Sequence, residues 1–267
     1  MDTADSRRLA VVTGASSGIG RELAKQFAAN GFDLIIAAED DAIVAAASEL
    51  EGLGAQVVAE QVDLSSGDGV ERLCRSIDEV GRPVDAAALN AGIGAGGAFA
   101  TDTELADELR LIDLNVRSTV HLAKHLVRDM AARGEGRLLF TSSIASTMPG
   151  SFQAVYNASK SFVQSFALAL REELSDTGVS VTSLMPGPTE TEFFERADML
   201  DTKVGAGDKD DAADVARDGF EALMAGTERV VSASLSTELQ GRGSRFMPDS
   251  AKAKMHRRMA EPGSAKQ

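Results

Sequence analysis

The feature that most constrains the fold is a regular alternation of short apolar segments with longer segments of helical periodicity. The segments rich in Val, Ile and Leu predict strands over Leu9–Thr13, Asp33–Ala37, Gln56–Val62, Val84–Leu89, Arg137–Ser142, Val179–Leu184 and Arg229–Val231. The periodic segments predict helices over Ile19–Asn30, Asp41–Leu53, Gly67–Val80, Glu104–Ala132, Phe152–Asp176 and Ala212–Met224. Continuous apolar strands alternating with helices are typical of a parallel sheet covered on both faces. The chain is therefore expected to form an α/β fold with a doubly wound parallel sheet.

The chain of 267 residues is 43% hydrophobic, which suffices for one large core. We find no internal repeat and no Pro- or Ser-rich linker, so residues 1–267 are expected to form a single domain. Two segments depart from the alternation. Residues 188–211 mix aromatic residues with Gly and Asp and predict a substrate lid, and residues 241–267 predict a C-terminal appendage.

Composition argues against several classes of partner. The 41 acidic and 27 basic residues give a net charge of −14, which repels nucleic acid and anionic lipid, so neither a nucleic acid nor a membrane partner is expected. No apolar run approaches the roughly 20 residues that span a bilayer, and the first residues lack a signal-peptide pattern, so a cytoplasmic protein is expected. The single cysteine, Cys74, lies at helical spacing among apolar residues and is expected to be buried.

The first predicted strand and helix are joined by a glycine-rich turn, Thr13-Gly14-Ala15-Ser16-Ser17-Gly18-Ile19-Gly20. Glycines allow the backbone to turn tightly and approach a pyrophosphate, whose charge then meets free N–H groups and the positive end of the helix dipole. A turn required only for packing is the alternative, because the spacing is G-x-x-x-G-x-G rather than G-x-G-x-x-G. The turn predicts a dinucleotide site on a Rossmann-type sheet.

A second motif, Tyr156-Asn157-Ala158-Ser159-Lys160, lies near the start of a long predicted helix. Residues four apart share one helix face, so Tyr156 and Lys160 are neighbours. A phenol with a pKa of about 10 is a poor acid-base catalyst near neutrality, but an adjacent ammonium favours the phenolate. Ser143 follows a predicted strand, at the edge where open α/β sheets bind ligands. These side chains predict a site that hydrogen-bonds a substrate oxygen and exchanges a proton with it.

In order along the chain, TGASSGIG, Asn90-Ala91-Gly92, Asn115 in LIDLNV, Ser143, YNASK and Pro186-Gly187 resemble the motifs of the short-chain dehydrogenase/reductase family. The resemblance extends from about Leu9 to Met224. It implies an NAD(P)-dependent oxidoreductase that transfers a hydride between nicotinamide and a small-molecule alcohol or ketone. It also implies the role of each catalytic residue: Tyr156 is the acid or base, Ser143 orients and polarises the carbonyl, Lys160 lowers the tyrosine pKa and holds the nicotinamide ribose, and Asn115 supports a proton relay through water.

The same resemblance implies a cofactor bed. The pyrophosphate and adjoining ribose are expected to contact Gly14, Ser16, Ser17, Gly18, Ile19 and Gly20, and the adenine to contact Asp63 and Leu64. The middle of the cofactor is expected to contact Asn90, Ala91 and Gly92, and the carboxamide to contact Pro186, Gly187, Thr189 and Thr191. Tyr156 and Lys160 complete the set. For Asn90, bracing the sheet by hydrogen bonds is an equal alternative.

Glu39 bears on which cofactor is used. It lies 21 residues after Gly18, at the end of the second predicted strand, where an acidic residue accepts hydrogen bonds from the adenosine ribose. Its charge repels a 2′-phosphate, and Ser16 and Ser17 supply no cation. We therefore expect NAD(H) to be preferred, with NADP(H) not excluded because Arg21 lies nearby.

Apolar residues in several segments are expected to wall a pocket beside Tyr156 and to select an apolar alcohol or ketone: Phe99, Met148, Phe152, Phe193, Phe194, Met199 and Leu200. One alternative is a catalytically silent nicotinamide-binding regulatory protein of the same fold. Another is an isomerase or dehydratase that uses bound cofactor catalytically. The complete set of catalytic residues argues against the first alternative, and the short substrate region argues against the second.

The helices Glu104–Ala132 and Phe152–Asp176 are the longest predicted, and the second is apolar around much of its circumference. In the resembling family the corresponding helices form a subunit interface, so a homodimer or homotetramer is expected. His121 and His125 are four residues apart but have no third ligand at suitable spacing. We expect no metal site.

Overall fold

The structure is a computed structural model that describes residues 7–232 and 247–266. Its strands are β1 (Arg8–Thr13), β2 (Phe32–Ala38), β3 (Val57–Gln61), β4 (Ala86–Leu89), β5 (Gly136–Thr141), β6 (Val179–Pro186) and β7 (Arg229–Ser232). Its helices are α1 (Gly18–Ala29), α2 (Ala42–Gly52), α3 (Gly67–Glu79), α4 (Leu105–Ile112), η1 (Asp113–Ser118), α5 (Thr119–Arg133), η2 (Ile144–Thr147), α6 (Ala154–Glu173), α7 (Phe193–Arg196), α8 (Lys203–Ala206), α9 (Ala212–Met224), α11 (Asp249–Ala260) and η3 (Ser264–Lys266).

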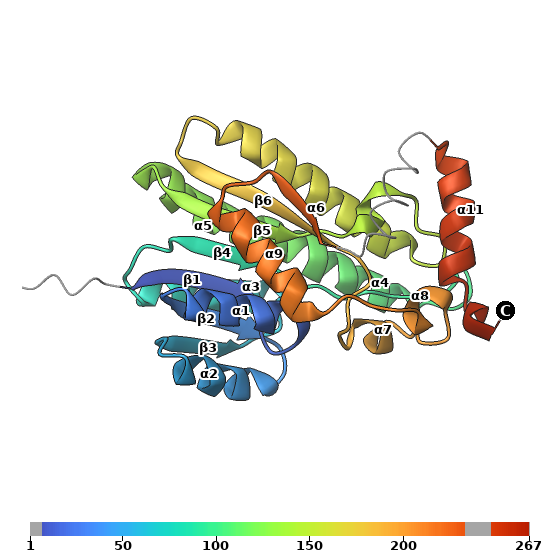
Figure 1. The fold of residues 1–267 in the computed structure, drawn as a ribbon, viewed down its shortest axis with the longest axis horizontal. Helices are drawn as coiled ribbons and strands as arrows, with labels where there is room; N and C mark the ends of the chain where they lie inside the picture. Colours follow the sequence, from blue (N-terminus) through green and yellow to red (C-terminus); the bar gives the residue numbers. More distant parts are fainter. Residues whose placement is uncertain (1–6, 233–246, 267) are drawn as a thin grey trace, which may run out of the picture.

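The strands form one parallel sheet in the order β3-β2-β1-β4-β5-β6-β7 (Figure 1). Val11 of β1 pairs with Ile35 of β2 on one side and Ala87 of β4 on the other. The chain thus winds outward from β1 to β3 and then crosses back to β4. Such a reversal leaves a crevice at the carboxyl ends of the strands, where ligands bind. The predicted α/β fold, a doubly wound parallel sheet, is confirmed.

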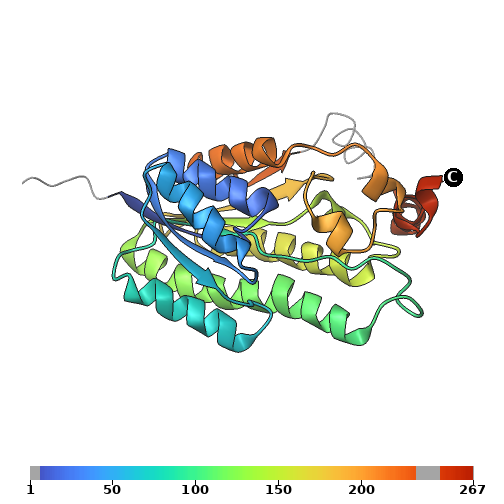
Figure 2. The same cartoon turned by 90° about the horizontal axis from the view of Figure 1, so that it is seen from below.

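Helices cover both faces of the sheet (Figure 2). Helices α1, α2 and α9 lie on one face, and α3, α5 and α6 lie on the other. On the first face Phe27 contacts Phe32 and Phe220 edge to face, with ring centroids 5.1 Å apart in each pair. On the second face Cys74 packs in the core as predicted, and burial raises the pKa of its thiol to about 11. Both faces of the sheet are therefore buried beneath packed apolar side chains.

Two predicted helices differ from those observed. The segment Glu104–Ala132 is helical throughout most of its length, but Asp113–Ser118 forms a π-helical turn between α4 and α5. The next long helix, predicted from Phe152, begins two residues later, at Ala154, because Phe152 has a left-handed backbone (φ 64°). That helix also ends early, at Glu173. The remaining predicted boundaries agree to within two residues.

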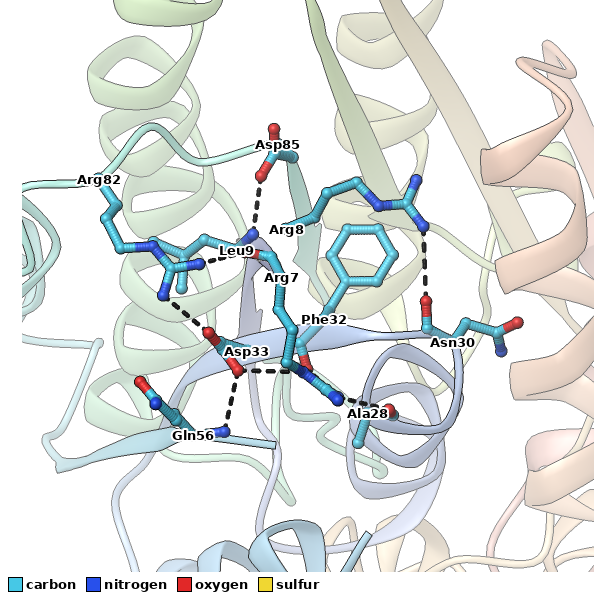
Figure 3. Close-up of polar contacts among 10 residues, drawn as sticks. All are labelled: Arg7, Arg8, Leu9, Ala28, Asn30, Phe32, Asp33, Gln56, Arg82 and Asp85. Carbon is cyan, nitrogen blue, oxygen red and sulfur yellow. Dashed lines mark hydrogen bonds and ion pairs between the residues drawn. The ribbon is translucent and has the colours of Figure 1, made fainter. Parts of the chain in front are cut away.

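At the amino-terminal edge of the sheet, the carboxylate of Asp33 joins three segments (Figure 3). It lies 3.2 Å from Arg7 Nε and 2.7 Å from Arg82 Nη1, and it accepts a hydrogen bond from the Gln56 backbone N–H at 3.0 Å. Arg82 also donates to the Arg7 carbonyl. Burial alone would raise the pKa of Asp33, but these hydrogen bonds and charges outweigh burial and hold it below its usual value. The network stabilises the end of the sheet opposite the ligand-binding crevice.

Past the carboxyl ends of the strands, the predicted lid contains α7 and α8, and the predicted appendage contains α11 and η3 (Figures 1 and 2). Residues 241–246 and 267 of that appendage lie outside the described residues. The two segments pack together: Phe194 and Met199 share an apolar cluster with Ala260, and Lys203 N donates to Ser264 Oγ at 3.0 Å. No helix within residues 7–232 and 247–266 has the length and hydropathy needed to cross a bilayer.

Candidate active site

A cavity opens at the carboxyl ends of the central strands, between the glycine-rich turn and α11. Every residue predicted for the catalytic and cofactor sites lines this cavity except Gly20 and Asn115, which lie behind its wall. The residues come from the turn after β1, the ends of β2 and β3, the loops after β4 and β5, α6, and the segment after β6. The fold thus assembles one site from elements distant in sequence.

The glycine-rich turn is held against the neighbouring strand and its own helix. Gly14 N and Ala15 N donate to the Ala37 carbonyl of β2 at 2.8 and 3.2 Å. Gly14 has a left-handed backbone (φ 68°), and a Cβ on Gly20 would lie 2.0 Å from the Gly14 carbonyl oxygen. Only glycine allows this close approach. The amino end of α1 therefore faces the cavity with its first N–H groups.

At the end of β2, charged residues surround the cavity in a way that the sequence did not indicate. Glu39 forms an ion pair with Arg110 of α4, and Asp63 Oδ2 lies 3.7 Å from the same guanidinium. Asp40 Oδ2 accepts a hydrogen bond from Ser16 Oγ at 3.0 Å and lies 3.9 Å from Arg196 Nη2 of α7. Two arginines thus approach the acidic rim, whereas the sequence analysis considered only the cations of the turn and of α1.

Asn90 braces three strands. Its Nδ2 donates to the Thr13 carbonyl at 3.2 Å, and its Oδ1 accepts from Thr141 Oγ1 at 3.0 Å. Its backbone N–H donates to Thr13 Oγ1 at 3.0 Å. These contacts correspond to the bracing alternative, although Asn90 also lines the cavity.

Asn115 lies in the π-helical turn and is buried. Its Oδ1 accepts from Ile93 N and its Nδ2 donates to the Ile93 carbonyl, both at 2.9 Å, and Nδ2 also donates to Ser159 Oγ at 3.0 Å. A Cβ on Gly92 would lie 3.1 Å from Asn115 Oδ1 and 3.3 Å from Lys160 Nζ, so both groups lie against Gly92. Asn115 therefore fixes the loop after β4 beside the lysine.

Tyr156 and Lys160 lie one turn apart on α6, as predicted, and both are buried. Lys160 Nζ lies 5.9 Å from the centre of the tyrosine ring and donates to the Thr141 carbonyl at 2.9 Å. Ser143 Oγ accepts from Ala145 N at 3.1 Å and donates to the Pro186 carbonyl at 3.5 Å, and the hydroxyl is close enough to lower the pKa of Tyr156. The phenol, the ammonium and a serine hydroxyl therefore converge in one cavity.

Burial opposes the charged form of both ionisable groups. It raises the pKa of Tyr156 to about 12, and the hydrogen bond from Ser143 offsets only part of that shift. Burial also lowers the pKa of Lys160 to about 8. At Tyr156, loss of solvation outweighs the hydrogen bond from Ser143, so the phenol is protonated at neutral pH, and the lowering of its pKa by Lys160 stays a prediction.

The predicted apolar wall is correct only in part. Met148, Phe193 and Phe194 line the cavity, and the Phe193 ring centroid lies 5.1 Å from that of Tyr156. Phe152 and Met199 pack behind the wall, in the cluster that joins the predicted lid to α11. The placement of Phe99 and Leu200 in the wall is wrong, because their side chains are 61% and 56% exposed and face solvent.

Other cavity residues were not predicted from the sequence: Gln153, Arg196, Val204, His256, Met259 and Ala260. Gln153 donates to Met199 Sδ at 2.9 Å, and His256 Nδ1 lies 2.9 Å from the Ser151 carbonyl oxygen. Gln153 had one available signal, its position three residues before Tyr156. The α11 residues had none, because no local pattern showed that the appendage returns to the cavity.

His121 and His125 project from α5 toward carboxylates on α3. His121 Nε2 lies 3.1 Å from Glu71 Oε1, and His125 Nε2 lies 3.1 Å from Asp78 Oδ1. In the described part of the chain, no three His, Cys, Asp or Glu side chains converge as metal ligands would.

Comparison with known families places this arrangement in context. Residues 8–200 match the family model described as short chain dehydrogenase. A sulfoacetaldehyde reductase of Chromohalobacter salexigens is 32% identical over 69% of this chain and 74% of its own length. A 1-deoxy-11-beta-hydroxypentalenate dehydrogenase of Streptomyces exfoliatus is 36% identical over 75% of this chain and 76% of its own.

Two solved structures show the same similarity. A short-chain dehydrogenase from Sphingobium yanoikuyae in complex with NADPH has a TM-score of 0.79 and 26% identity, covering 89% of this chain and 93% of that one. A short-chain dehydrogenase/reductase from Burkholderia phymatum in complex with NAD has a TM-score of 0.79 and 25% identity, covering 89% and 92%. The two structures contain different cofactors.

Proposed function

The chain belongs to the short-chain dehydrogenase/reductase family, and from this premise we propose that it oxidises or reduces an apolar alcohol or ketone with a nicotinamide cofactor. The observation that carries the proposal is the convergence of Tyr156, Lys160 and Ser143 in the cavity that also contains the glycine-rich turn. Acid-base chemistry and dinucleotide binding then share one site.

The residues present fit a nicotinamide dinucleotide. The turn at Gly14 presents backbone N–H groups at the amino end of α1, where a pyrophosphate is stabilised. In this proposal the phosphates and adjoining ribose are held by Gly14, Ser16, Ser17, Gly18 and Ile19, and Gly20 keeps the turn close to the helix. The adenosine ribose is held by Glu39 and the adenine by Asp63 and Leu64. The middle of the cofactor contacts Asn90, Ala91 and Gly92, and the carboxamide contacts Pro186, Gly187, Thr189 and Thr191. When bound, the nicotinamide supplies or accepts the hydride.

Tyr156 is the proposed proton donor and acceptor. In reduction, the substrate carbonyl carbon gains a hydride, the π pair moves to oxygen, and that oxygen takes the phenol proton. In oxidation the same steps run in reverse. Ser143 donates a hydrogen bond to the substrate oxygen and so orients it beside Tyr156.

Lys160 and Asn115 support this exchange. In this proposal the ammonium of Lys160 stabilises developing charge on Tyr156 and holds the nicotinamide ribose. Asn115, held by Ile93 and Ser159, keeps the loop after β4 in place and contributes to a proton relay through water. In this proposal these four residues act as one catalytic unit.

Glu39 supports a preference for NAD(H) over NADP(H). Its carboxylate lines the cavity at the end of β2, with Asp40 beside it. Three carboxylates at this end of the cavity, those of Glu39, Asp40 and Asp63, face two guanidinium groups, those of Arg110 and Arg196. The net charge of the group is therefore negative, and it disfavours a 2′-phosphate.

The substrate end of the cavity supports an apolar alcohol or ketone. Met148, Phe193, Phe194 and Met259 line it, and residues 188–211, with α7 packed beside Tyr156, serve as a lid over the reacting carbon. One relative is named as a dehydrogenase of 1-deoxy-11-beta-hydroxypentalenate. We expect the enzyme to work in the cytoplasm as a homodimer or homotetramer.

The test is absorbance of reduced nicotinamide during incubation with a panel of apolar alcohols and ketones and each cofactor. Turnover of at least one substrate is expected. Binding of the cofactor, seen as a change in its fluorescence, with no turnover of any panel member would contradict the proposal and favour a silent nicotinamide-binding protein.

A further inference from the structure

The far end of the cavity, away from the glycine-rich turn, is closed by α11 and contains a buried histidine. Met259 and Ala260 contribute apolar surface, whereas His256 brings a ring with two nitrogens. The imidazole is only 6% exposed. A buried polar ring requires a polar partner.

One of the two ring nitrogens has its partner within the protein. His256 Nδ1 lies 2.9 Å from the carbonyl oxygen of Ser151, in the loop before α6. A carbonyl oxygen only accepts hydrogen bonds, so Nδ1 carries the hydrogen. This bond also joins α11 to the loop that leads into the helix of Tyr156.

The tautomer follows from that contact. Burial lowers the pKa of His256, although the bond to Ser151 partly opposes the shift, so the ring is neutral at neutral pH. In a neutral imidazole with its hydrogen on Nδ1, the other nitrogen, Nε2, is a hydrogen-bond acceptor. Because His256 lines the cavity and its Nδ1 is engaged by Ser151, Nε2 is the ring nitrogen left to accept a hydrogen bond there.

We infer that His256 is a specificity residue whose Nε2 accepts a hydrogen bond from a second hydroxyl group of the substrate, distant from the carbon that is oxidised or reduced. The inference rests on the proposed function and narrows its substrate class to hydroxylated ketones and the corresponding diols with an otherwise apolar body. A hydroxyl at this place satisfies the Nε2 acceptor, whereas a hydrocarbon covers it and leaves it unpaired.

The discriminating measurement is a ratio of kcat/KM values for matched substrates. The probes are aliphatic 2-ketones and the hydroxyketones of equal chain length, with the hydroxyl moved one carbon at a time away from the carbonyl. Wild type is expected to favour the hydroxyketone roughly tenfold at one hydroxyl position, as the loss of one buried hydrogen bond predicts.

Two variants separate recognition from structure. His256→Asn retains an N–H group able to reach the Ser151 carbonyl but lacks Nε2, and His256→Phe retains the ring volume without either nitrogen. Both should bring the ratio close to one. His121→Asn, on α5, serves as the matched control and should leave the ratio unchanged. Melting temperatures establish that each variant is folded.

The two proposals fail in different ways. If wild type reduces none of the probes or the wider substrate panel, the proposed function fails. If wild type reduces ketones but shows no hydroxyl preference, or if the ratio is the same in wild type and both variants, the assignment of His256 is overturned while the function stands. Equal losses on both members of every pair would also overturn it, since they indicate a purely structural role.

Discussion

Tyr156 and Lys160 share a cavity that disfavours charge on either side chain. With pKa values of about 12 and about 8, the phenol keeps its proton and the lysine keeps its charge at neutral pH. This is the protonation state that carbonyl reduction requires of a proton donor and its electrostatic support. In the proposed reduction, burial therefore keeps the phenol protonated, whereas Lys160 retains its charge at neutral pH in spite of burial.

Replacing Tyr156 by Phe removes the proton donor without changing the ring packed against Phe193. Turnover is expected to fall by roughly 10²–10⁴-fold while cofactor affinity is retained, because general acid-base catalysis is lost and binding is not. Steady-state kinetics and cofactor fluorescence measure the two effects. Near-normal turnover in this variant would exclude Tyr156 as the catalytic acid or base.

The lowered pKa of Lys160 predicts a pH dependence of cofactor binding. The ammonium is present below about pH 8 and is lost as the pH rises through that value. The dissociation constant of the cofactor should therefore rise about 3- to 10-fold between about pH 7 and about pH 9, since a charged donor binds more strongly than a neutral one. In Lys160→Met binding should be weak and independent of pH. A wild-type dissociation constant that stays flat across this range would contradict the role of Lys160.

The preference for NAD(H) is tested at Glu39. Glu39→Arg should raise the ratio of kcat/KM for NADP(H) to that for NAD(H) by about tenfold or more, equivalent to at least about 1.4 kcal/mol. Arg110→Ala is the matched control, because it frees Glu39 from its ion pair without adding a cation. This control should not increase use of NADP(H). A wild type that prefers NADP(H) and loses that preference in Arg110→Ala would show that Arg110, not Glu39, reads the ribose.

Among the secondary-structure elements, β2 has charged side chains at both ends, and these side chains make different contacts. Its carboxyl end bears the acidic cavity rim, and its amino end bears the Asp33 network with Arg7, Arg82 and Gln56 (Figure 3). The first of these serves ligand binding. The second joins β2 to the residue before β1, to β3 and to the loop before β4, so it contributes to the stability of the sheet.

Asp33→Asn tests that contribution. The variant keeps the shape and an acceptor for Gln56 N but loses the charge, and the free energy of unfolding at neutral pH should fall by roughly 1.5–3 kcal/mol. Because the folded-state pKa of Asp33 lies below its ordinary value of 3.8, its stabilisation is present above that value and is lost as the pH falls through the folded pKa. Denaturant unfolding should therefore show a smaller loss of stability on acidification in the variant. Equal acid sensitivity in both proteins would show that the ion pairs contribute little.

At the scale of the whole molecule, α4, α5 and α6 leave apolar side chains uncovered on one outer surface. Leu105, Leu109 and Ile112 of α4 and Phe162 of α6 are exposed, Leu105 to 69%. Surfaces of this kind mark subunit interfaces, of which a stable one buries about 1,600 Å² in total. We expect the chain of 27.9 kDa to form dimers or tetramers through these helices.

Light scattering at micromolar concentration measures the assembly. The wild-type mass should be two or four times that of the chain, and Leu109→Glu together with Phe162→Glu should shift it downward. Val44→Glu, an exposed apolar position on α2 of the opposite layer, is the control and should leave the mass unchanged. A wild type that scatters only as a monomer would contradict the predicted interface.

Features that depend on neighbours along the chain could be predicted from the sequence. Apolar periodicity indicated the seven strands and the long helices that flank the sheet, and the four-residue spacing placed Tyr156 beside Lys160, because both depend on local backbone geometry. The glycine-rich turn was likewise evident from its position between a strand and a helix. The start of α6 was misplaced because the left-handed backbone of Phe152 leaves no mark in the apolar pattern.

Contacts between residues distant in the sequence could not be predicted and are known from the folded structure. His256 contacts Ser151, 105 residues away in the sequence, and Arg110 contacts Glu39, 71 residues away. Apolar periodicity describes only local structure, so it cannot predict contacts at such separations. The same reason explains why Phe99 and Leu200 turned out to face solvent, while α11 lines the substrate end of the cavity. Strand and helix formation follows from local propensity and pattern, but the wall of the site depends on how the loops beyond the sheet pack on one another.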